Sequence, residues 1–561
     1  MTRLALSGFL CACCLGTATG FLCRSLTTKT RPTIGSPILA AKDSYDVVVI
    51  GSGIGGLCCA SMLAKYGYSV AVFEQHYSPG GAAHGYQVKT KEGTFSFDTG
   101  PSFFSGLNPD IPAKASNPLR TILDALDEEV ECVPYTTFGL MLPEGRLTHT
   151  ADFTQLLAQV GSNVDDWNLL LNRMKPLEAA VAALPTAALR FDVGAVLTVG
   201  PFLPNFASLN PLENLKLTKP FSTILEGIRD PFVRNWMDLL CFCLSGLPAD
   251  GTITAEMALM LGEFYQPTAT MDAPQGGASA IVDALVRGLT KNGGELHVGT
   301  SVDSVEVEGG RAVGVKLANG QVVLAKQAVV SNLSVWDLYG SDMIPRGVLS
   351  PRFVQERVET PPGKSFMHLH VGFRMTRVEL QKLEAHYIYL KDWSRGVEAE
   401  DNAVLVSIPS VHDESLAPEG YGVLHAYTPA TEDYSLWQGI DRHSQEYKQL
   451  KEERSQYIWD VLETIIPDIR QRSYISQVGS PLTHQRWLRR HQGSYGPAIR
   501  AGEQSFPFPS TPLNGLLVCG DSCFPGIGVP AVAGSGLLAA HSISLGSVKP
   551  QLAVLKSLKA L

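Results

Sequence analysis

A strand-like run that leads into closely spaced glycines decides much of this chain's fold. The run is Asp46-Val-Val-Val-Ile-Gly-Ser-Gly-Ile-Gly-Gly56, and an apolar, alanine-containing stretch suited to a helix follows it. In such a unit Gly51 permits the tight turn, Gly53 lets the backbone approach a pyrophosphate, and Gly56 allows close packing of helix on strand. The helix N-terminus then directs unpaired N–H groups and the positive end of its dipole at the phosphates.

An acidic residue stands at the end of the next predicted strand, Ser69–Phe73. This residue, Glu74, follows Gly56 by 18 positions, and its carboxylate can accept hydrogen bonds from both hydroxyls of an adenosine ribose. Strand, glycines, helix, strand and acid in this order predict a dinucleotide-binding site. A glycine-rich turn without a ligand is the weaker alternative, because it accounts for a lone glycine pattern but not for the ordered set.

The composition is that of an ordinary globular protein with room for two or three domains. Of its 561 residues, 45% are hydrophobic and 18% are charged. The formal net charge of −9 disfavours nucleic acid as a partner, because a polyanion would be repelled. Of 11 cysteines, the seven beyond the first 42 residues form no CxxC pair and no metal-ligand spacing. We therefore expect a reducing compartment, no disulfide framework and no metal site.

The first 42 residues have the composition of a targeting sequence. They hold five basic residues and no acidic residue. Arg3 precedes an apolar stretch and small residues, as in a secretory signal peptide, and Phe21 opens a basic, Ser/Thr-rich segment of transit-peptide character. This order resembles the two-part presequences of algae whose plastid derives from a secondary endosymbiosis, which predicts plastid (chloroplast) localisation. A secretory signal or an N-terminal membrane anchor are the alternatives.

The dinucleotide-type pattern returns twice along the chain, which predicts a domain assembled from separate pieces. One return begins at Gln275–Ser279 and continues through a hairpin turned at Gly309-Gly310. The other is Gly515–Asp521, followed by Pro525–Val529 and an apolar helix. We predict an α/β fold with a Rossmann-type nucleotide domain formed by residues 43–110, 271–345 and 476–548, a largely helical substrate or membrane-facing region at 111–270, and a mixed α+β substrate domain at 346–475.

Four groups of residues carry a resemblance to a known family. They are Val329–Asn332 with Trp336-Asp337, Ser407–Val411 with Leu416–Gly420, Thr483-His484 with Gly493–Pro497, and Cys519–Gly526. These stretches resemble the flavoprotein family of phytoene desaturases, carotenoid isomerases and retinol saturases, and most of all its carotenoid (prolycopene) isomerase branch. The similarity spans roughly residues 44–548 and is weak across 111–270. Pro530 and Gly534 depart from the usual isomerase form.

The resemblance implies a non-covalent FAD in a glutathione reductase-like fold. Gly80-Gly81, soon after the ribose-binding acid, suits a flavin because the backbone must pass close to the cofactor. By resemblance, the cofactor-binding residues would be Gly51, Gly53, Gly56 and Gly81 at the pyrophosphate, Glu74 at the ribose, Val302 at the adenine, Asp521 at the pyrophosphate–ribityl region, and Gly528 and Val529 at the flavin. The residues leave open a helix N-cap for Asp521 and a core strand position for Val302.

The family also implies a carotenoid or xanthophyll substrate. The expected chemistry is cis–trans isomerisation with reduced FAD. Alternatives are hydration of an unsaturated carbon, desaturation or saturation with an electron donor that the sequence does not identify, and a non-catalytic carotenoid-binding protein. The acid–base candidates nearest to the flavin motifs are His84, Asp98, His484 and Tyr495, each of which is equally compatible with a structural polar group.

One apolar segment, Phe191–Leu212, is a candidate for peripheral contact with the plastid membrane. Its charge-free part contains Pro201, Pro204 and Pro211, which argue against a helix that spans a bilayer. Such a patch could draw a lipid-soluble polyene from the membrane. An ordinary buried helix pair is the alternative.

Overall fold

The computed structural model describes residues 41–108, 117–206, 209–210, 214–265 and 269–559. The presequence predicted at residues 1–42 lies almost entirely outside this range. From Ala41 to Leu561 the chain forms one compact unit by its internal contacts. The boundaries proposed above between a nucleotide domain and substrate domains therefore stay a prediction, although two separate large sheets are present.

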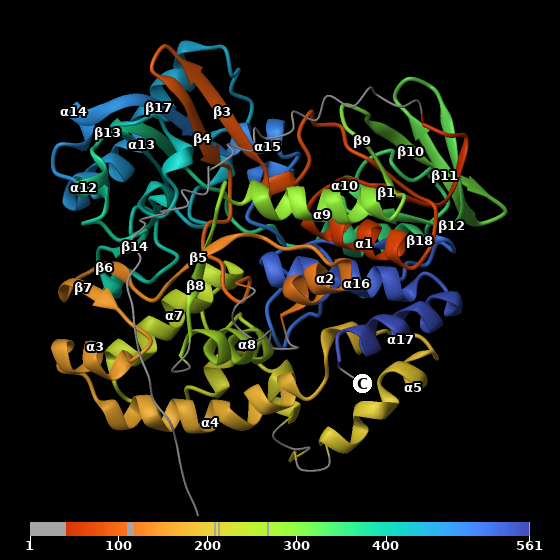
Figure 1. Cartoon of the computed structure of the whole chain (residues 1–561), viewed down its shortest axis with the longest axis horizontal. Helices are drawn as coiled ribbons and strands as arrows, with labels where there is room; N and C mark the ends of the chain where they lie inside the picture. The colour runs from red at the N-terminus through yellow and green to blue at the C-terminus, as the bar shows by residue number, and fades with distance from the viewer. Residues whose placement is uncertain (1–40, 109–116, 207–208, 211–213, 266–268, 560–561) are drawn as a thin grey trace, which may run out of the picture. The chain divides into compact units, whose positions relative to one another are not determined.

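The first sheet is built from strands that lie far apart in the sequence (Figure 1). Its order is β10-β11-β12-β1-β2-β9, and β18 pairs with β12. The central pairings are parallel, whereas β10 and β11 form an antiparallel extension. The strands are β1 (Ser44–Ile50), β2 (Val70–Phe73), β9 (Glu295–His297), β10 (Val302–Glu308), β11 (Arg311–Leu317), β12 (Val322–Ser331) and β18 (Leu516–Val518).

Both faces of this sheet are covered, as expected for parallel strands with continuous apolar runs. Val47 and Val49 of β1 belong to one core cluster, and Val48 and Ile50 belong to another. The first cluster includes helices α1 (Ile54–Lys65), α2 (Pro118–Leu126), α9 (Ser279–Lys291) and α16 (Val529–Ser542), and the second includes α10 (Val335–Tyr339) with side chains of α11 (Pro351–Val358) packed against it. The result is a three-layer arrangement around β1.

The predicted hairpin between β10 and β11 is confirmed. Gly309 and Gly310 connect the two antiparallel strands with φ angles of 55° and 76°. Positive φ at both central residues is the requirement of a type I′ turn, which glycine meets without steric cost.

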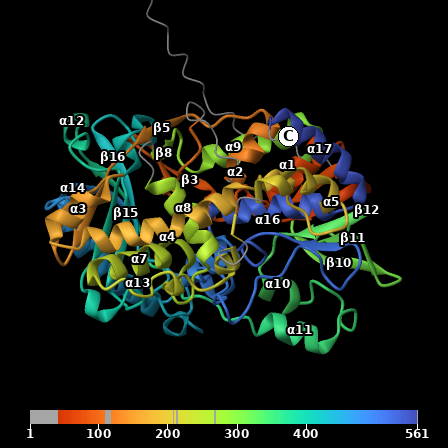
Figure 2. The same ribbon diagram turned by 90° about the horizontal axis from the view of Figure 1, so that it is seen from below.

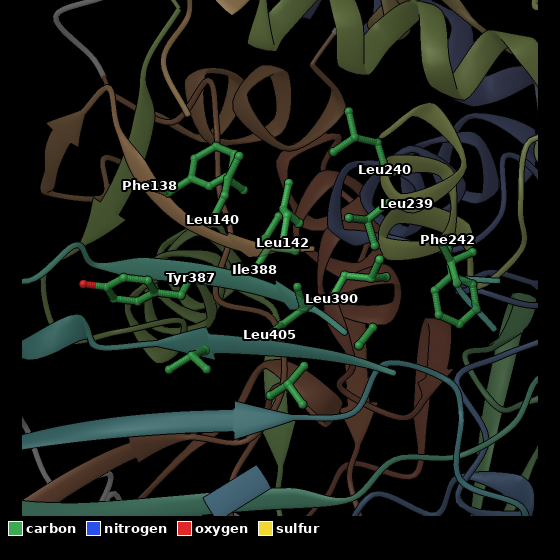
Figure 3. Close-up of a cluster of buried hydrophobic side chains, with 14 of the residues drawn as sticks. Phe138, Leu140, Leu142, Leu239, Leu240, Phe242, Tyr387, Ile388, Leu390 and Leu405 are labelled. Atoms are coloured by element: carbon green, nitrogen blue, oxygen red, sulfur yellow. The ribbon is translucent and has the colours of Figure 1, made fainter. Parts of the chain in front are cut away.

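The second sheet has the order β17-β13-β16-β15-β14-β6-β7. A core cluster lies between it and helix α7 (Pro231–Ser245), where Leu239, Leu240 and Phe242 face Leu140, Ile388 and Leu405 (Figure 3). Its strands are β6 (Phe138–Leu142), β7 (Gly145–His149), β13 (His368–Arg374), β14 (His386–Leu390), β15 (Ala403–Ser407), β16 (Tyr421–Tyr427) and β17 (Ser473–Gly479). Two smaller pairs are β3 (Gly85–Thr90) with β4 (Gly93–Asp98), and β5 (Cys132–Tyr135) with β8 (Met271–Pro274).

The described part of residues 111–270 is largely helical, as predicted, but it also contributes the strands β5, β6 and β7, which were not predicted. Strand β6 is buried along almost its whole length, so it lacks the apolar–polar alternation that signals a half-exposed strand. Strand β5 has only four residues and contains Pro134. The helices of the region are α2, α3 (Phe153–Val160), α4 (Val164–Ala182), α5 (Ala195–Thr198), α7 (Pro231–Ser245) and α8 (Thr254–Phe264), and those that follow later are α12 (Arg377–Leu380), α13 (Gln445–Ile465), α14 (Ile469–Arg472), α15 (Pro481–Trp487) and α17 (Val548–Ser557).

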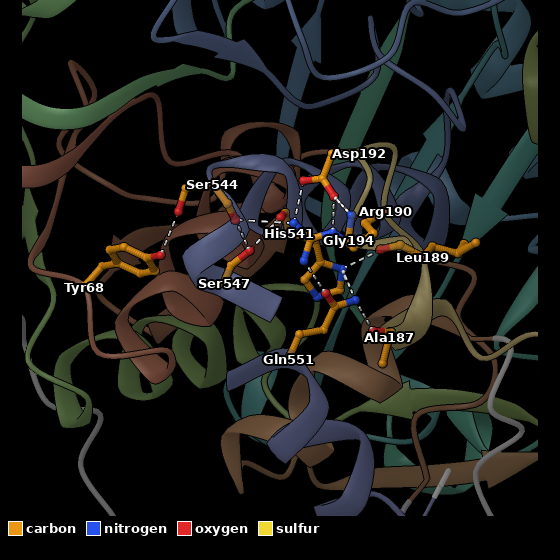
Figure 4. Close-up of polar contacts among 10 residues, drawn as sticks. All are labelled: Tyr68, Ala187, Leu189, Arg190, Asp192, Gly194, His541, Ser544, Ser547 and Gln551. Atoms are coloured by element: carbon orange, nitrogen blue, oxygen red, sulfur yellow. Dashed lines mark hydrogen bonds and ion pairs between the residues drawn. The ribbon is translucent and has the colours of Figure 1, made fainter. Parts of the chain in front are cut away.

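A buried polar network fastens the segment before α5 to the C-terminal helices (Figure 4). Arg190 donates to Asp192 from Nε at 2.6 Å and to the side chain of Gln551 from Nη1 at 3.1 Å. His541 Nδ1 lies 2.6 Å from the carbonyl oxygen of Leu189. The Arg190 side chain is fully buried, and its bond to Gln551, together with the contact between His541 and Leu189, holds the apolar segment that follows against α16 and α17.

Among the described residues, no single helix combines the length and apolar character needed to cross a membrane. Helix α16 reaches the required length and apolar character only when it is taken together with Leu545–Ser557, and the two segments are bent by 107° relative to each other.

Candidate active site

A cavity of about 430 Å³ lies at the carboxyl ends of the parallel strands of the first sheet. The turns after β1 and β2, the end of β12 and the loop before α16 all line it. Open α/β sheets bind ligands at this edge. Of the predicted site residues, Gly56 and Asp98 are not in its lining, whereas Gly51, Gly53, Glu74, Gly81, His84, Val302, His484, Tyr495, Asp521, Gly528 and Val529 are.

Two glycine turns form one wall of the cavity with bare backbone. A Cβ atom on Gly81 would lie 3.1 Å from Gly53 Cα, and one on Gly53 would lie 2.5 Å from Asn332 Nδ2. Gly53 is also the N-cap of α1 and supplies no side-chain hydrogen bond. The first N–H groups of α1 are therefore left for a ligand, and the positive end of the helix dipole favours an anionic one.

Gly56 has a packing role and does not face the cavity. A Cβ atom at this position would lie 2.2 Å from the carbonyl oxygen of Gly51. The prediction that Gly56 faces a pyrophosphate is thus not met, while the expectation that it allows α1 to pack closely on the β1 turn is confirmed. The reason is geometric, because Gly56 lies almost one turn beyond the N-cap.

Glu74 is held rigidly at the end of β2. Its Oε2 accepts hydrogen bonds from the Ser52 N–H at 2.9 Å and the Ser52 hydroxyl at 2.7 Å, and its Oε1 accepts one from the His76 N–H at 2.8 Å. These bonds orient the carboxylate beside the first glycine turn. The place is suitable for the hydroxyls of a ribose, and that role remains a prediction.

A second helix N-terminus reaches the same cavity from the other end of the chain. Gly528, with a φ of 96°, is the N-cap of α16 and again supplies no side-chain hydrogen bond. Asp521 does not cap this helix, so the alternative interpretation of Asp521 as its N-cap residue is excluded. Instead its Oδ2 accepts a bond from Arg490 Nη1 at 2.5 Å, and Arg490 Nη2 donates to the carbonyl oxygen of Tyr495 at 2.5 Å.

Two residues of the wall were missed by the sequence analysis as site residues. Asn332 follows β12, and its amide lies within 3 Å of where Cβ atoms on Gly53, Gly55 and Gly520 would stand. Arg490 lines the cavity and fixes Asp521. The position of Asn332 after a buried apolar strand was the available signal, since polar residues at the carboxyl ends of parallel strands meet at one edge.

Val302, the first residue of β10, lies at the cavity.

Three of the four acid–base candidates line the cavity, and none is an ionised group. Burial lowers the pKa of His84, and it lowers the pKa of His484 to about 3. Burial raises the pKa of Tyr495, whose hydroxyl donates to the carbonyl oxygen of Cys243 at 3.0 Å. All three side chains are therefore neutral near pH 7.

Asp98, the fourth candidate, is a structural residue. Its Oδ1 accepts a hydrogen bond from the Ala278 N–H at 2.9 Å, just before α9. It lies outside the lining of the cavity, so the structure gives it no contact with a bound substrate.

These features fit a flavin dinucleotide. Two uncapped helix N-termini and a pair of glycine turns suit the pyrophosphate, and a held carboxylate suits the ribose. A cavity assembled from three distant parts of the chain, with apolar side chains farther along, is what a long amphipathic cofactor requires.

The chain belongs to the family of flavin containing amine oxidoreductases, whose model matches residues 54–544. It is thus an enzyme of a flavin-dependent class, and its cofactor is FAD.

The chain is also similar to individual proteins and to solved structures. Prolycopene isomerase from Daucus carota is 31% identical over 534 residues, which cover 90% of this chain and 81% of the relative. All-trans-retinol 13,14-reductase from Danio rerio is 25% identical and covers 85% of this chain and 80% of the relative. An oxidoreductase structure from Methanosarcina mazei covers 88% of this chain and 99% of its own with a TM-score of 0.56 at 20% identity, which shows a shared fold.

Proposed function

We propose that this protein isomerises a cis carotenoid to a trans form without net oxidation or reduction. The proposal rests on similarity to prolycopene isomerase along 90% of the chain and on one feature of the site. That feature is the uncharged end of the cavity, where Phe366, His368, Tyr427, His484 and Tyr495 gather.

The uncharged end suits a polyene because burial keeps every titratable group there neutral. Burial lowers the pKa of His368 and His484 and raises the pKa of Tyr427 and Tyr495. None of these groups exchanges a proton readily near pH 7, and cis–trans isomerisation needs no proton transfer. Bound FAD in its reduced form would supply electron density that lowers the order of a polyene double bond and permits rotation.

The residues of this chain provide position and exclusion of water. The side chains of Phe366 and Tyr495 contact each other with ring centroids 5.2 Å apart, and Phe366 also contacts His368. An aromatic wall of this kind holds an apolar substrate by area and shape. Arg490 fixes both Asp521 and the Tyr495 backbone, and so it couples the phosphate side of the cavity to this wall.

The test is an anaerobic incubation of the purified protein with chemically reduced FAD and a panel of cis carotenoids. We expect a product of changed retention time and unchanged mass. A gain of two hydrogens would instead show a saturase, and a loss of two a desaturase. Substrates returned unchanged across the panel, by a protein shown to hold FAD, would reject the proposal.

A half-buried carboxyl group beside the cavity, although outside its lining, favours hydration as the second candidate. Burial raises the pKa of Glu256 to about 8. Its Oε1 lies 3.3 Å from where a Cβ on Gly526 would stand, two residues before the N-cap of α16. A carboxylic acid that is protonated near pH 7 can act as a general acid in an addition of water. In the same incubation, hydration would appear as a product heavier by one water and lost in Glu256→Gln.

We further propose peripheral contact with a membrane through the segment around α5. Val193 and Val196 are each 76% exposed, and Leu197 and Leu203 are 59% and 62% exposed. Exposed aliphatic side chains in such number indicate an interaction surface. The predicted patch extended to Leu212, but residues 207–208 and 211–213 are not among those described.

Vesicle sedimentation tests this contact. We expect the double variant Val193→Asp/Val196→Asp to bind anionic or neutral lipid vesicles at least tenfold more weakly than the parent protein. Val378→Asp is the matched control, because Val378 is also exposed, at 66%, but lies on α12 in the other half of the molecule (Figure 2). Equal binding by all three proteins would contradict the proposal.

Plastid localisation is proposed from the composition of residues 1–42 and from the chloroplastic designation of the relative in Daucus carota. A fluorescent protein fused to residues 1–42 should enter the plastid of an alga with a secondary plastid, whereas the Phe21→Ala form should stop earlier in the secretory route. Secretion of both fusions would contradict it.

A further inference from the structure

Three histidines from two neighbouring strands lie together on one face of the second sheet. His368 and His370 are two positions apart on β13, so their side chains lie on the same face. His425 stands directly opposite His370 on β16. Each of the three offers a ring nitrogen, and these nitrogens lie within 4.8 Å of one another. The His-Leu-His spacing on a strand was the signal in the sequence, which the expectation of no metal site overlooked.

The cluster is buried and incompletely hydrogen-bonded. His368, His370 and His425 are 3%, 7% and 3% exposed. Within the part of the chain that the structure describes, His368 Nε2 and His425 Nδ1 have no hydrogen-bond partner, and the same is true of Nε2 of the neighbouring His484. Buried polar atoms in folded proteins are nearly always paired, so several unpaired nitrogens in one place call for a further ligand.

His370 also has the support that metal-binding histidines require. Its Nε2 lies 2.9 Å from the backbone carbonyl oxygen of Asp98, to which a neutral ring can donate its single N–H. The ring also has a backbone hydrogen-bond partner at Gln477 on β17, which a metal ion bound at its other nitrogen would replace. A backbone carbonyl in this role fixes the tautomer and the orientation of a ligating ring.

We propose that His368, His370 and His425 bind one divalent first-row transition metal ion, of which Zn²⁺ is the test case. A set of three imidazoles without carboxylates selects Zn²⁺, Cu²⁺, Ni²⁺ or Fe²⁺ over Mg²⁺ and Ca²⁺, which prefer oxygen.

Binding requires the imidazole rings to rearrange. The two nitrogens that face each other, His368 Nδ1 and His425 Nε2, are 2.5 Å apart, whereas nitrogens on a tetrahedral zinc ion at about 2.0–2.1 Å lie roughly 3.3 Å from each other. The His370 and His425 rings are stacked with an interplanar angle of 2°, so at least one of them must turn out of the stack before both can direct a nitrogen at one ion. The proposal does not depend on the isomerase function, because it concerns metal content alone.

The test uses the flavin-loaded protein, equilibrated with Zn²⁺, freed of unbound metal and assayed by elemental mass spectrometry. We expect one zinc per chain, a melting temperature that rises with Zn²⁺ concentration, and no comparable rise with Mg²⁺. His368→Gln and His425→Gln should each lower zinc affinity at least tenfold with flavin content retained. His443→Gln, at an exposed histidine, should leave it unchanged.

The parent protein alone decides the outcome if these variants fail to fold. Absence of stoichiometric zinc together with a melting temperature indifferent to Zn²⁺ would overturn the proposal. Zinc bound with equal affinity by the parent and by a folded His425→Gln variant would overturn it as well. Anomalous scattering at the zinc absorption edge in crystals must place the ion among the three histidines, and a peak elsewhere would reject this site.

Discussion

Single glycines decide whether the cavity can accept a cofactor. A Cβ atom on Gly53 would lie only 2.5 Å from Asn332 Nδ2, so any side chain at this position would clash. A carboxylate at this position would also stand at the N-terminus of α1, where phosphate is expected to bind. We predict that Gly53→Asp folds but retains less than about a tenth of the flavin absorbance of the parent protein, a loss that corresponds to at least 1.4 kcal/mol of binding.

The matched control for this substitution is Gly200→Asp, because a Cβ atom at Gly200 has nothing within 4 Å. It should keep its flavin. Normal flavin content in a folded Gly53→Asp protein would remove the glycine turn from the cofactor site.

A buried histidine far from the cavity makes the fold sensitive to acid. Burial lowers the pKa of His149 from the usual 6.5 to about 3. Between these values the unfolded chain binds a proton at this residue and the folded chain does not. The contribution of His149 is therefore intact above pH 6.5 and is lost, by about 1.4 kcal/mol per pH unit, as the pH falls towards 3.

His149→Phe should remove this part of the pH dependence. Its ring already stacks on Phe138 at 4.2 Å, so a phenyl ring fits the surroundings. In urea unfolding measured from pH 6.5 to 4.5, we expect a smaller loss of stability in the variant than in the parent. His443→Phe, at a solvent-exposed position, should reproduce the parent slope; if His149→Phe does the same, the assignment to His149 is wrong.

At the residue level, the sequence predicted those positions whose role is local. Gly51, Gly53 and Glu74 belong to one strand–turn–helix–strand unit, and their spacing is sufficient to place them at the cavity edge. Asn332 and Arg490 depend on contacts with residues roughly 30 to 280 positions away, which no local pattern encodes.

Among the elements, the segment that carries α5 depends on Arg190, which forms an ion pair with Asp192 of the same segment and donates a hydrogen bond to Gln551 of α17. Arg190 is fully buried and bonds both Asp192 and Gln551. Removing one partner of a buried ion pair leaves unpaired polar groups, a loss of about 3–5 kcal/mol, and we expect the lower end here because Asp192 is 29% exposed.

The variant Arg190→Ala should therefore unfold at clearly lower denaturant concentration, and protease should cut first near α5. Arg346→Ala is its control, since the pair of Arg346 with Asp342 is 91% and 81% exposed and exposed pairs contribute little. Equal stability of the two variants would show that the network does not hold the segment.

Element prediction succeeded where periodicity and end signals coincide. The hairpin at Gly309-Gly310 and the apolar helix α16, which begins directly after Gly528, follow such signals. Strand β6 was missed because burial on both faces removes the alternation, and one of its two partners, β14, lies some 250 residues away, so that pairing is a tertiary effect.

In the molecule as a whole, FAD chemistry requires that both ends of the chain close one cavity. Helices α1 and α16 pack in one core and present two uncapped N-termini to the same space. That composite site could be anticipated from the returning glycine patterns and from family resemblance. The neutral aromatic end of the cavity could not, since burial alone sets the charge state of its histidines and tyrosines.

The most direct test of the central claim follows flavin and substrate together in one anaerobic reaction. Reduced, flavin-loaded protein is mixed with an excess of cis carotenoid, while flavin absorbance, product mass and product geometry are recorded. The account predicts many product molecules per flavin, all of unchanged mass, with the flavin still reduced at the end. Product limited to one per flavin, formed as the flavin becomes oxidised, would contradict it.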